Sequence, residues 1–351
     1  KVGPKSAGSE PGPACYGRGG VEPTVTDANL KLGYLNPEYF AGGTVAIRAE
    51  LAQAALEDIG AVIGRDAAAA AWGMHDVVAE NMAGAARVHV AERGRDPRDF
   101  VLLCTGGGGP VHSYYVAQKI GVKTIICPPA AGVASAYGLL VAPARSDRSR
   151  TVSIRPASDS LELLEKAFQS LESEARAALS DLASAFGPVS VTRHADGRFA
   201  GQGFNLSVRL PQGPYACADS CEVAQIREAL ISAFECAYRE KFGRTPPDVP
   251  VELVNLRVTA EAPPKRGFEP APLHGASKGT PKGERSVYFK ESAGYVKTPI
   301  YERSALHVGF KLQGPMVIED PSSSLVVGPK GCVEQLASGN LVITLQESNH
   351  E

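Results

Sequence analysis

The sequence lacks long apolar runs and any excess of charge of one sign, and these absences exclude several classes of protein. No apolar run among the 351 residues reaches the length of a transmembrane helix. The 36 Lys and Arg residues are balanced by 38 Asp and Glu residues, so the formal net charge is −2. A net charge this small gives no reason to expect nucleic acid or an anionic membrane as a partner.

Cysteine is sparse and irregularly placed. The seven cysteines are odd in number and scattered, which argues against a disulfide framework and favours a reducing cytoplasm. Cys217 and Cys221 are the only close pair, and no second Cys or His pair follows them at the spacing of a zinc site. We therefore predict that they are ordinary residues and not zinc ligands, and we name no metal-ligating residues.

The first residues also lack two features that proteins often have. The sequence does not begin with Met, and it has no signal peptide, which would need a basic start and an apolar run. Residues 1–44 are instead rich in Gly and Pro, with Ala, Cys and Tyr interleaved, which is unlike a flexible Gly/Ser linker. We interpret this segment as an ordered loop that was cut, or as the continuation of a longer polypeptide.

The chain is organised around residues 101–112, where a short apolar run enters four consecutive glycines (106–109) and then Pro110. This order predicts a strand, a tight glycine turn and a helix whose first turn contains the proline. A helix N-terminus behind a glycine turn favours anions such as phosphate, although a plain strand–helix turn is the simpler interpretation. The loop is neither a Walker A motif nor a dinucleotide fingerprint, because the remaining residues of both patterns are missing.

The hydrophobic periodicity predicts an α/β fold. Residues 46–63 and 66–93 are expected to form amphipathic helices. Strands over 100–105 and 124–127, separated by a helix over 111–120, predict a buried parallel pair. A second turn, made of small residues, is expected over 128–138. Ligands in such sheets lie at the carboxyl ends of the strands, which is where the four glycines stand.

The rest of the chain has a different character. Residues 149–265 alternate between strand patterns and two long amphipathic helices, expected over 158–186 and 222–242, which predicts an α+β domain. Residues 266–351 begin in a connector rich in Pro, Gly, Lys and Ser and continue as short strands separated by turns. We predict three domains, which are the glycine-loop domain (1–148), the α+β domain (149–265) and a β-rich domain (266–351).

Six segments, in this order along the chain, resemble the hydantoinase A / 5-oxoprolinase family. The first is long and specific, and together the segments span nearly the whole chain. They are residues 3–17, 23–29, 106–112, 132–138, 201–204 and 314–319. The family includes ATP-dependent N-methylhydantoinases, 5-oxoprolinases, a caprolactam hydrolase and the ketone carboxylases that act on acetone or acetophenone.

The resemblance implies an actin/sugar-kinase-like fold with ATP between two lobes, of which residues 1–148 would be part of the second lobe. It implies that ATP, with Mg²⁺, phosphorylates a carbonyl or enol oxygen. The activated species then accepts water or reacts with a carboxyl donor, which requires the weakly nucleophilic oxygen to lie in line with the γ-phosphorus.

Two departures from the family pattern are visible. Gly108 takes the place of an alanine in the family's Gly-Gly-Ala-Gly-Pro loop, which should preserve the turn and loosen it. The Gly-Gly-Thr phosphate loop of the family's N-terminal lobe does not occur in this sequence. The resemblance therefore implies that the chain is the second part of a family member, with two partners: the missing lobe and a subunit of the hydantoinase B type.

The resemblance also suggests roles for individual residues. Asp27 is expected either to be the N-cap of a helix over 28–33 or to face Mg²⁺ or substrate. His112 is expected to bond a phosphate or substrate oxygen, or to cap its turn. Cys15 and Cys104 are expected to be small packed residues, because the sequence identifies no basic partner for either. The residues expected to contact the nucleotide are Gly106, Gly107, Gly108 and Gly109.

Three functions remain open at this point. The first is a subunit of an ATP-dependent amidohydrolase or ketone carboxylase, two activities that the sequence does not separate. The second is a non-catalytic structural subunit, which the missing lobe favours and the intact glycine loop disfavours. The third is a sugar-kinase-like phosphotransferase acting on a small alcohol. We expect a hetero-oligomer acting on a small molecule in the first case.

Overall fold

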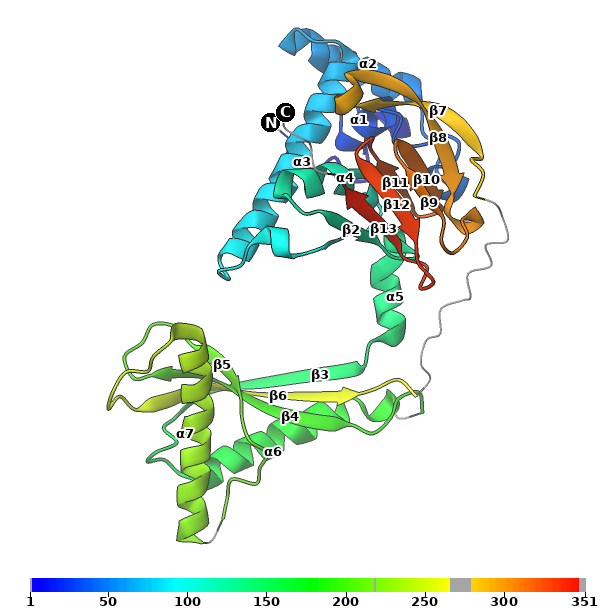
Figure 1. The fold of residues 1–351 in the computed structure, drawn as a ribbon. Helices are drawn as coiled ribbons and strands as arrows, with labels where there is room; N and C mark the ends of the chain where they lie inside the picture. The colour runs from blue at the N-terminus through cyan, green and yellow to red at the C-terminus, as the bar shows by residue number, and fades with distance from the viewer. Residues whose placement is uncertain (1, 183, 218, 266–278, 347–351) are drawn as a thin grey trace. The chain divides into compact units, whose positions relative to one another are not determined.

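The computed structural model describes residues 2–182, 184–217, 219–265 and 279–346 (Figure 1). Helices and sheets are mixed throughout, which confirms the predicted α/β class. The chain forms two compact units: unit 1 contains residues 1–138 and 270–351, and unit 2 contains residues 139–269. The sequence suggested three domains, whereas the structure groups the β-rich end of the chain with the beginning.

The helices of unit 1 follow from alanine-rich amphipathic patterns. Asp66 starts the longest of them by accepting a hydrogen bond from the Ala69 N–H at 2.7 Å. The small alanine side chains on its inner face are buried, so it packs closely against the neighbouring helices. The two helices predicted over 46–63 and 66–93 are confirmed, with slightly later starts. The helices are α1 (Val25–Lys31), α2 (Ala49–Ile63), α3 (Ala67–Ala91) and α4 (Gly109–Ile120).

The first sheet of unit 1 joins the glycine-loop segment to the end of the chain. β1 (Leu102–Leu103) pairs in parallel with β2 (Thr124–Cys127), as predicted, although β1 is shorter than expected. β13 (Leu341–Leu345) lies antiparallel to β2, with Ile343 opposite Ile125. This pairing explains why the C-terminal strands belong to unit 1. The order is β1-β2-β13-β12-β9, with β12 at Gly331–Gln335 and β9 at Lys311–Gln313.

The second sheet of unit 1 packs on the same hydrophobic core. Its strands are β7 (Gly283–Phe289), β8 (Gly294–Glu302), β10 (Met316–Asp320) and β11 (Ser323–Val327), in the order β11-β10-β8-β7. β10 runs parallel to β8 and antiparallel to β11. Val317 and Val326 face each other and are fully buried, and the side of β11 contacts α4. Strands β8, β9 and β12 were not predicted from the sequence.

Unit 2 is an antiparallel sheet with two helices and a core of its own. The strand order is β3-β6-β4-β5, and β6 pairs with both β3 and β4. Leu164, Phe168, Phe234 and Leu253 are fully buried between helices and sheet. The elements are β3 (Ala144–Ile154), α6 (Leu161–Ala177), β4 (Ser190–Phe199), β5 (Leu206–Arg209), α7 (Ser220–Phe242) and β6 (Val251–Ala262).

Two segments differ from the sequence prediction. The first long helix of unit 2 was expected to continue to residue 186, but α6 ends at Ala177 and is followed by a short 3₁₀ turn. The segment predicted as a turn over 128–138 contains helix α5 (Ala134–Val141). In the described part of the chain, no helix is both long and apolar enough to cross a membrane.

A buried ion pair holds α6 to the sheet of unit 2. The Arg193 guanidinium of β4 donates two hydrogen bonds to the Glu165 carboxylate, at 2.6 and 3.0 Å, and a third to Glu172 at 2.6 Å. The rings of Phe168 and Tyr215 lie against the guanidinium, and the side chains of Arg193 and Glu165 are 6% and 5% exposed. Removing one partner would leave an uncompensated buried charge.

We therefore expect Arg193→Met to destabilise unit 2 strongly, by about 3 to 5 kcal/mol in the free energy of unfolding. Urea unfolding followed by far-ultraviolet circular dichroism would measure the loss. Arg150→Met is the matched control, because Arg150 contacts Glu174 at 3.2 Å on the surface and exposed pairs contribute little. Equal stability of the two variants would contradict this account of the buried pair.

Candidate functional site

The glycine loop is an exposed turn between β1 and α4. Gly106 has a φ of +86°, a conformation that residues with a side chain rarely adopt, and its N–H donates to the Ala131 carbonyl at 2.7 Å. Gly108 is the N-cap of α4, and Pro110 lies in the first turn of the helix. The sequence placed the helix start at residue 111, and the structure places it at Gly109. The predicted order of strand, glycine turn and helix is thus confirmed.

The surroundings of the loop are open, so its backbone can be approached. Gly106, Gly107 and Gly108 are exposed. A β-carbon added at Gly106 or Gly108 would meet no described atom within 4 Å, and one at Gly107 would lie 3.7 Å from the Ser322 carbonyl oxygen. The N–H groups at the start of α4 are available in the same place, and they carry the positive end of the helix dipole. The loop has the features of an anion site.

The turn between β10 and β11 adds a residue that the sequence did not identify. Ser322 approaches Gly107, and it is so close to Gly132 that a β-carbon there would lie 2.2 Å from its carbonyl oxygen. The glycine loop, the turn after β2 and the β10–β11 turn therefore meet. Of these two contacts of Ser322, the sequence gives a hint only for the one with Gly132, because Gly132 belongs to a turn of small residues.

A buried polar cluster lies directly behind the first turn of α4. The Asn29 side chain of α1 connects two histidines: His75 of α3, whose Nδ1 is 2.8 Å from Asn29 Oδ1, and His112 of α4, whose Nε2 is 3.2 Å from Asn29 Nδ2. The two imidazole rings are stacked, with centroids 4.4 Å apart and an interplanar angle of 15°. Exposure is 5% for Asn29, 0% for His75 and 7% for His112.

The Asn29 contacts assign the tautomers of both histidines. In this orientation of the Asn29 amide, Oδ1 accepts from His75, which carries its proton on Nδ1. Nδ2 donates to His112, which is unprotonated at Nε2 and carries its proton on Nδ1. Burial lowers the pKa of His112 to about 4, and burial together with the neighbouring His112 lowers the pKa of His75 to about 2. Both rings are therefore neutral at pH 7.

Each ring keeps one nitrogen unused within the described structure. These are His75 Nε2, which is an acceptor, and His112 Nδ1, which is a donor. His112 therefore offers a buried N–H in the first turn behind the glycine loop. Sequence reasoning identified His112 but missed Asn29 and His75, because they lie 83 and 46 residues from their partners.

Asp27 is buried and its carboxylate holds the loop of residues 14–24. It accepts hydrogen bonds from the N–H groups of Ala14, Cys15 and Thr24, at 3.2, 2.7 and 2.8 Å, and from Thr24 Oγ1 at 2.8 Å. The expectation that Asp27 is the N-cap was wrong. Thr24 is the N-cap of α1, and Asp27, the third residue of the helix, is its partner in a capping box. Its expected contact with Mg²⁺ or substrate stays a prediction.

Two other motif segments have structural contacts. Glu319 of β10 is 1% exposed and pairs with Lys282 at 2.8 Å and Arg285 at 2.9 Å, and these cations hold the pKa of its carboxyl below the usual range against the effect of burial. In unit 2, Gln202 accepts from the Phe199 N–H and donates to the Tyr238 hydroxyl at 2.8 Å. Both segments fix local folds.

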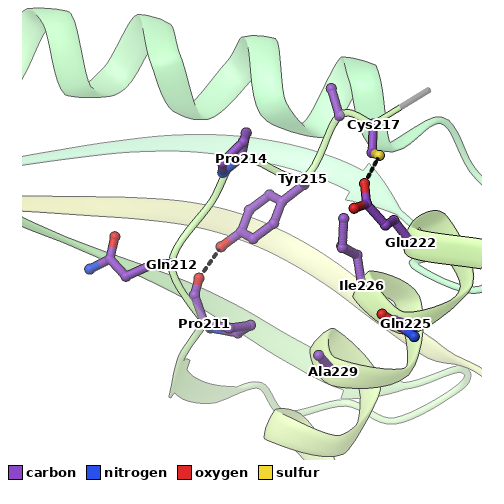
Figure 2. Close-up of a pocket in the computed structure, with 10 residues that line it drawn as sticks. Pro211, Gln212, Pro214, Tyr215, Cys217, Glu222, Gln225, Ile226 and Ala229 are labelled. Carbon is purple, nitrogen blue, oxygen red and sulfur yellow. Dashed lines mark hydrogen bonds between the residues drawn. The ribbon is translucent and has the colours of Figure 1, made fainter. Parts of the chain in front are cut away.

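Unit 2 contains a cavity of about 480 Å³ beside the start of α7 (Figure 2). The Tyr215 hydroxyl donates to the Pro211 carbonyl at 2.6 Å, and the Cys217 thiol donates to Glu222. That hydrogen bond raises the pKa of the Cys217 thiol, so the thiol is not activated as a nucleophile. None of the residues predicted for the site lies here.

Comparisons with known proteins agree with the resemblance. A sequence profile described as Hydantoinase/oxoprolinase matches residues 1–148, and one described as Hydantoinase/oxoprolinase C-terminal domain matches residues 155–342. The chain is 35% identical over 340 residues to the caprolactamase subunit alpha of Pseudomonas jessenii, covering 94% of this chain and 47% of that one. It is 30% identical over 342 residues to the acetophenone carboxylase gamma subunit of Aromatoleum aromaticum, covering 94% and 46%.

A solved structure shares the fold. The crystal structure of the ATP-dependent caprolactamase from Pseudomonas jessenii matches 98% of this chain and 50% of the solved chain, with a TM-score of 0.70 and 33% identity. The chain thus spans about half the length of the curated relatives named above.

The neutral histidine pair predicts acid sensitivity. Because the folded-state pKa of each histidine is lower than its unfolded value of 6.5, the unfolded chain binds more protons, and stability falls as the pH falls below 6.5. Between pH 7.5 and pH 5 this loss is on the order of 2 kcal/mol for each histidine. We expect His75→Asn, which keeps an N–H for Asn29, to lose less stability than the wild type over this range.

Chemical unfolding at the two pH values would measure the difference. His89→Asn is the matched control, since His89 is exposed on α3 and should leave the pH dependence unchanged. If the wild type and His75→Asn lose the same stability on acidification, the histidine pair is not the source of the sensitivity.

Proposed function

The chain belongs to the hydantoinase/oxoprolinase family, and we propose that it forms part of a subunit of an ATP-dependent enzyme. In the proposed reaction a carbonyl or enol oxygen of a small substrate is phosphorylated with ATP as donor, and the activated species then accepts water or a carboxyl donor. The names of the relatives, a caprolactamase and an acetophenone carboxylase, support two outcomes: hydrolysis of a cyclic amide and carboxylation of a ketone.

The glycine loop is the observation that carries the proposal. Its position after β1 and before α4, its exposure and the open space around it suit a nucleotide phosphate. The N–H of Gly106 donates to the Ala131 carbonyl. Within the described residues, the N–H groups of Gly107 and Gly108 donate no hydrogen bond. We assign these two N–H groups, with Gly109 at the start of the helix, to phosphate or adenosine contact.

His112 and Asp27 receive different proposed roles. His112 would donate its Nδ1–H to an anionic oxygen of nucleotide or substrate, with Asn29 and the stacked His75 ring fixing its orientation. Its low pKa keeps the ring neutral, so it would contribute a hydrogen bond without carrying a charge. Asp27 acts as a positioning residue, because its carboxylate is occupied by four donors.

The metal of the proposed reaction would come with the nucleotide. Mg²⁺ is commonly bound through substrate phosphates and water with one or two carboxylates. Among the residues that the structure describes, no group of three or more His, Cys, Asp or Glu side chains is placed to hold a metal. Within this chain, the residues that suit the metal-bound triphosphate are therefore the neutral N–H donors of the glycine loop.

The edge of the first sheet at β1 suits a protein partner. Within the described structure β1 pairs only with β2, and Phe100, Val101 and Leu103 are 48%, 55% and 59% exposed. Unpaired strand edges with apolar side chains are favourable sites for another strand. We propose that a polypeptide corresponding to the half of these relatives that this chain does not cover packs at this edge. This polypeptide would carry the Gly-Gly-Thr loop. A hydantoinase B type subunit would complete the assembly.

The glycine loop predicts a defined response to mutation. Gly107→Asp places a carboxylate where phosphate would bind, at an exposed position where the added β-carbon makes only an ordinary contact of 3.7 Å with the Ser322 carbonyl oxygen, and should lower the affinity of the complete assembly for ATP by at least tenfold. Gly108→Ala is the matched control, because an alanine fits there without strain, and it should bind ATP like the wild type. Isothermal titration calorimetry with Mg·ATP would measure both. Unchanged affinity of Gly107→Asp would support a non-catalytic structural subunit instead.

The exposed edge predicts a loss of assembly. Leu103→Lys should lower the fraction of the chain that copurifies with a partner carrying a Gly-Gly-Thr loop, because it places a charge on the edge proposed for pairing. Native mass spectrometry with peptide mapping would identify the partner and the remaining fraction. Leu163→Lys is the control, since Leu163 is 64% exposed on α6 of unit 2. An assembly equally sensitive to both substitutions, or to neither, contradicts the proposed edge.

A further inference from the structure

Two buried cysteines lie opposite each other at the base of the glycine loop. The parallel register of β1 and β2 pairs Leu103 with Ile126, so the next pair in the ladder is Cys104 and Cys127. The Cys104 N–H donates to the Ile126 carbonyl at 2.9 Å, so the backbone pairing continues to this point. Their side chains are 4% and 1% exposed and point into the same core.

The spacing of neighbouring strands suits a covalent link between these cysteines. Adjacent strands lie about 4.8 Å apart, and disulfides form between residues whose Cα atoms are about 4.4 to 6.8 Å apart. Only Thr105 separates Cys104 from Gly106. A disulfide here would therefore join the start of the glycine loop to the end of β2.

Arg303 makes Cys127 the more reactive of the two thiols. Its Nη1 lies 3.3 Å from Cys127 Sγ, and its Nη2 donates to the carbonyls of Cys127 and Gly339, at 2.9 and 3.1 Å, which fixes the guanidinium in place. The charged groups that face Cys127 are Arg303 and, with the opposite effect, Asp320, which lies 4.0 Å from Arg303.

The ionisation of the pair follows from these contacts. The interaction with the Cys104 thiol and the charge of Arg303 lower the pKa of the Cys127 thiol, although burial opposes this. The same interaction, with burial, raises the pKa of the Cys104 thiol. Cys127 is thus the more readily ionised of the two thiols and Cys104 is a thiol beside it, which is the arrangement of a dithiol ready for oxidation.

We propose that Cys104 and Cys127 are a modification site, a dithiol that a peroxide converts into a reversible disulfide beneath the glycine loop. The Cys127 thiolate attacks one peroxide oxygen and breaks the O–O bond, which gives a sulfenic acid and hydroxide. The Cys104 sulfur then attacks the sulfenic sulfur, and its proton leaves with the displaced oxygen. The sum is two thiols and one peroxide giving one disulfide and two waters, so the cysteines are oxidised and the peroxide is reduced.

The test uses the full chain in its native assembly, with Cys217, Cys221, Cys236 and Cys332 replaced by Ser so that exposed and half-exposed thiols do not react first. After treatment with hydrogen peroxide and alkylation of free thiols, peptide mapping should find one link, between Cys104 and Cys127, that dithiothreitol removes. Cys15 is the internal control: it is fully buried, and burial with the neighbouring Asp27 raises its pKa, so it should remain a thiol.

Two further measurements separate this site from adventitious oxidation. The initial rate should fall between pH 8 and pH 6 by clearly less than the roughly seventyfold expected of an ordinary thiol of pKa about 8.5, because the pKa of Cys127 is lowered. Cys104→Ser should leave a sulfenic acid on Cys127 that dimedone traps, and no link. Recovery of both cysteines as free thiols, oxidation of Cys15 at the same rate, or the steeper pH profile would each overturn the proposal.

Discussion

The antiparallel pairing of β13 with β2 is the constraint on which the candidate site depends. β1 contributes two residues to its sheet, and a two-residue strand cannot hold a glycine loop in place by itself. β2 is fixed because β13 supplies its second neighbour, with Ile343 against Ile125 in the core. A segment more than two hundred residues away in sequence therefore decides the position of the loop, through hydrogen bonds that the loop itself does not make.

The buried carboxylates and imidazoles described above in unit 1 follow one rule, which is that each charge has a partner and each unpaired ring is neutral. The Asn29 amide satisfies one nitrogen of each histidine and keeps both rings neutral, while the carboxylates of Asp27 and Glu319 are surrounded by donors. Among the described residues, this arrangement leaves the N–H groups of Gly107 and Gly108 and the Nδ1–H of His112 as donors without a partner. Because such donors are neutral, they can bind an anion, and no unpaired cation stays buried when the anion leaves.

The local parts of this arrangement could be predicted from the sequence, and the long-range parts could not. Alanine periodicity predicted α2 and α3, and the apolar runs beside four glycines predicted the parallel pair and the turn. The Thr24-x-x-Asp27 spacing is that of a capping box, but the N-cap was expected at Asp27, whereas it is Thr24. β8 and β12 escaped prediction because their exposed faces carry polar residues between short buried runs. The union of Asn29, His75 and His112 has no sequence signal, since each lies on a different helix. The family resemblance was confirmed because its motifs recur in order along the chain.

Unit 2 is inserted into unit 1, because the chain leaves unit 1 after residue 138 and returns to it at 270. The ladder between β3 and β6 begins with Ala144 opposite Ala262, so the two ends of the insertion lie side by side. Once unit 2 has folded, its two ends are held close together. Closing the sheet of unit 1 then no longer costs the entropy of closing a loop as long as residues 139–269. During synthesis, unit 2 is complete before β13 leaves the ribosome. The order of translation thus favours folding of the insertion first, and the first sheet of unit 1 can close only after β13 has been synthesised.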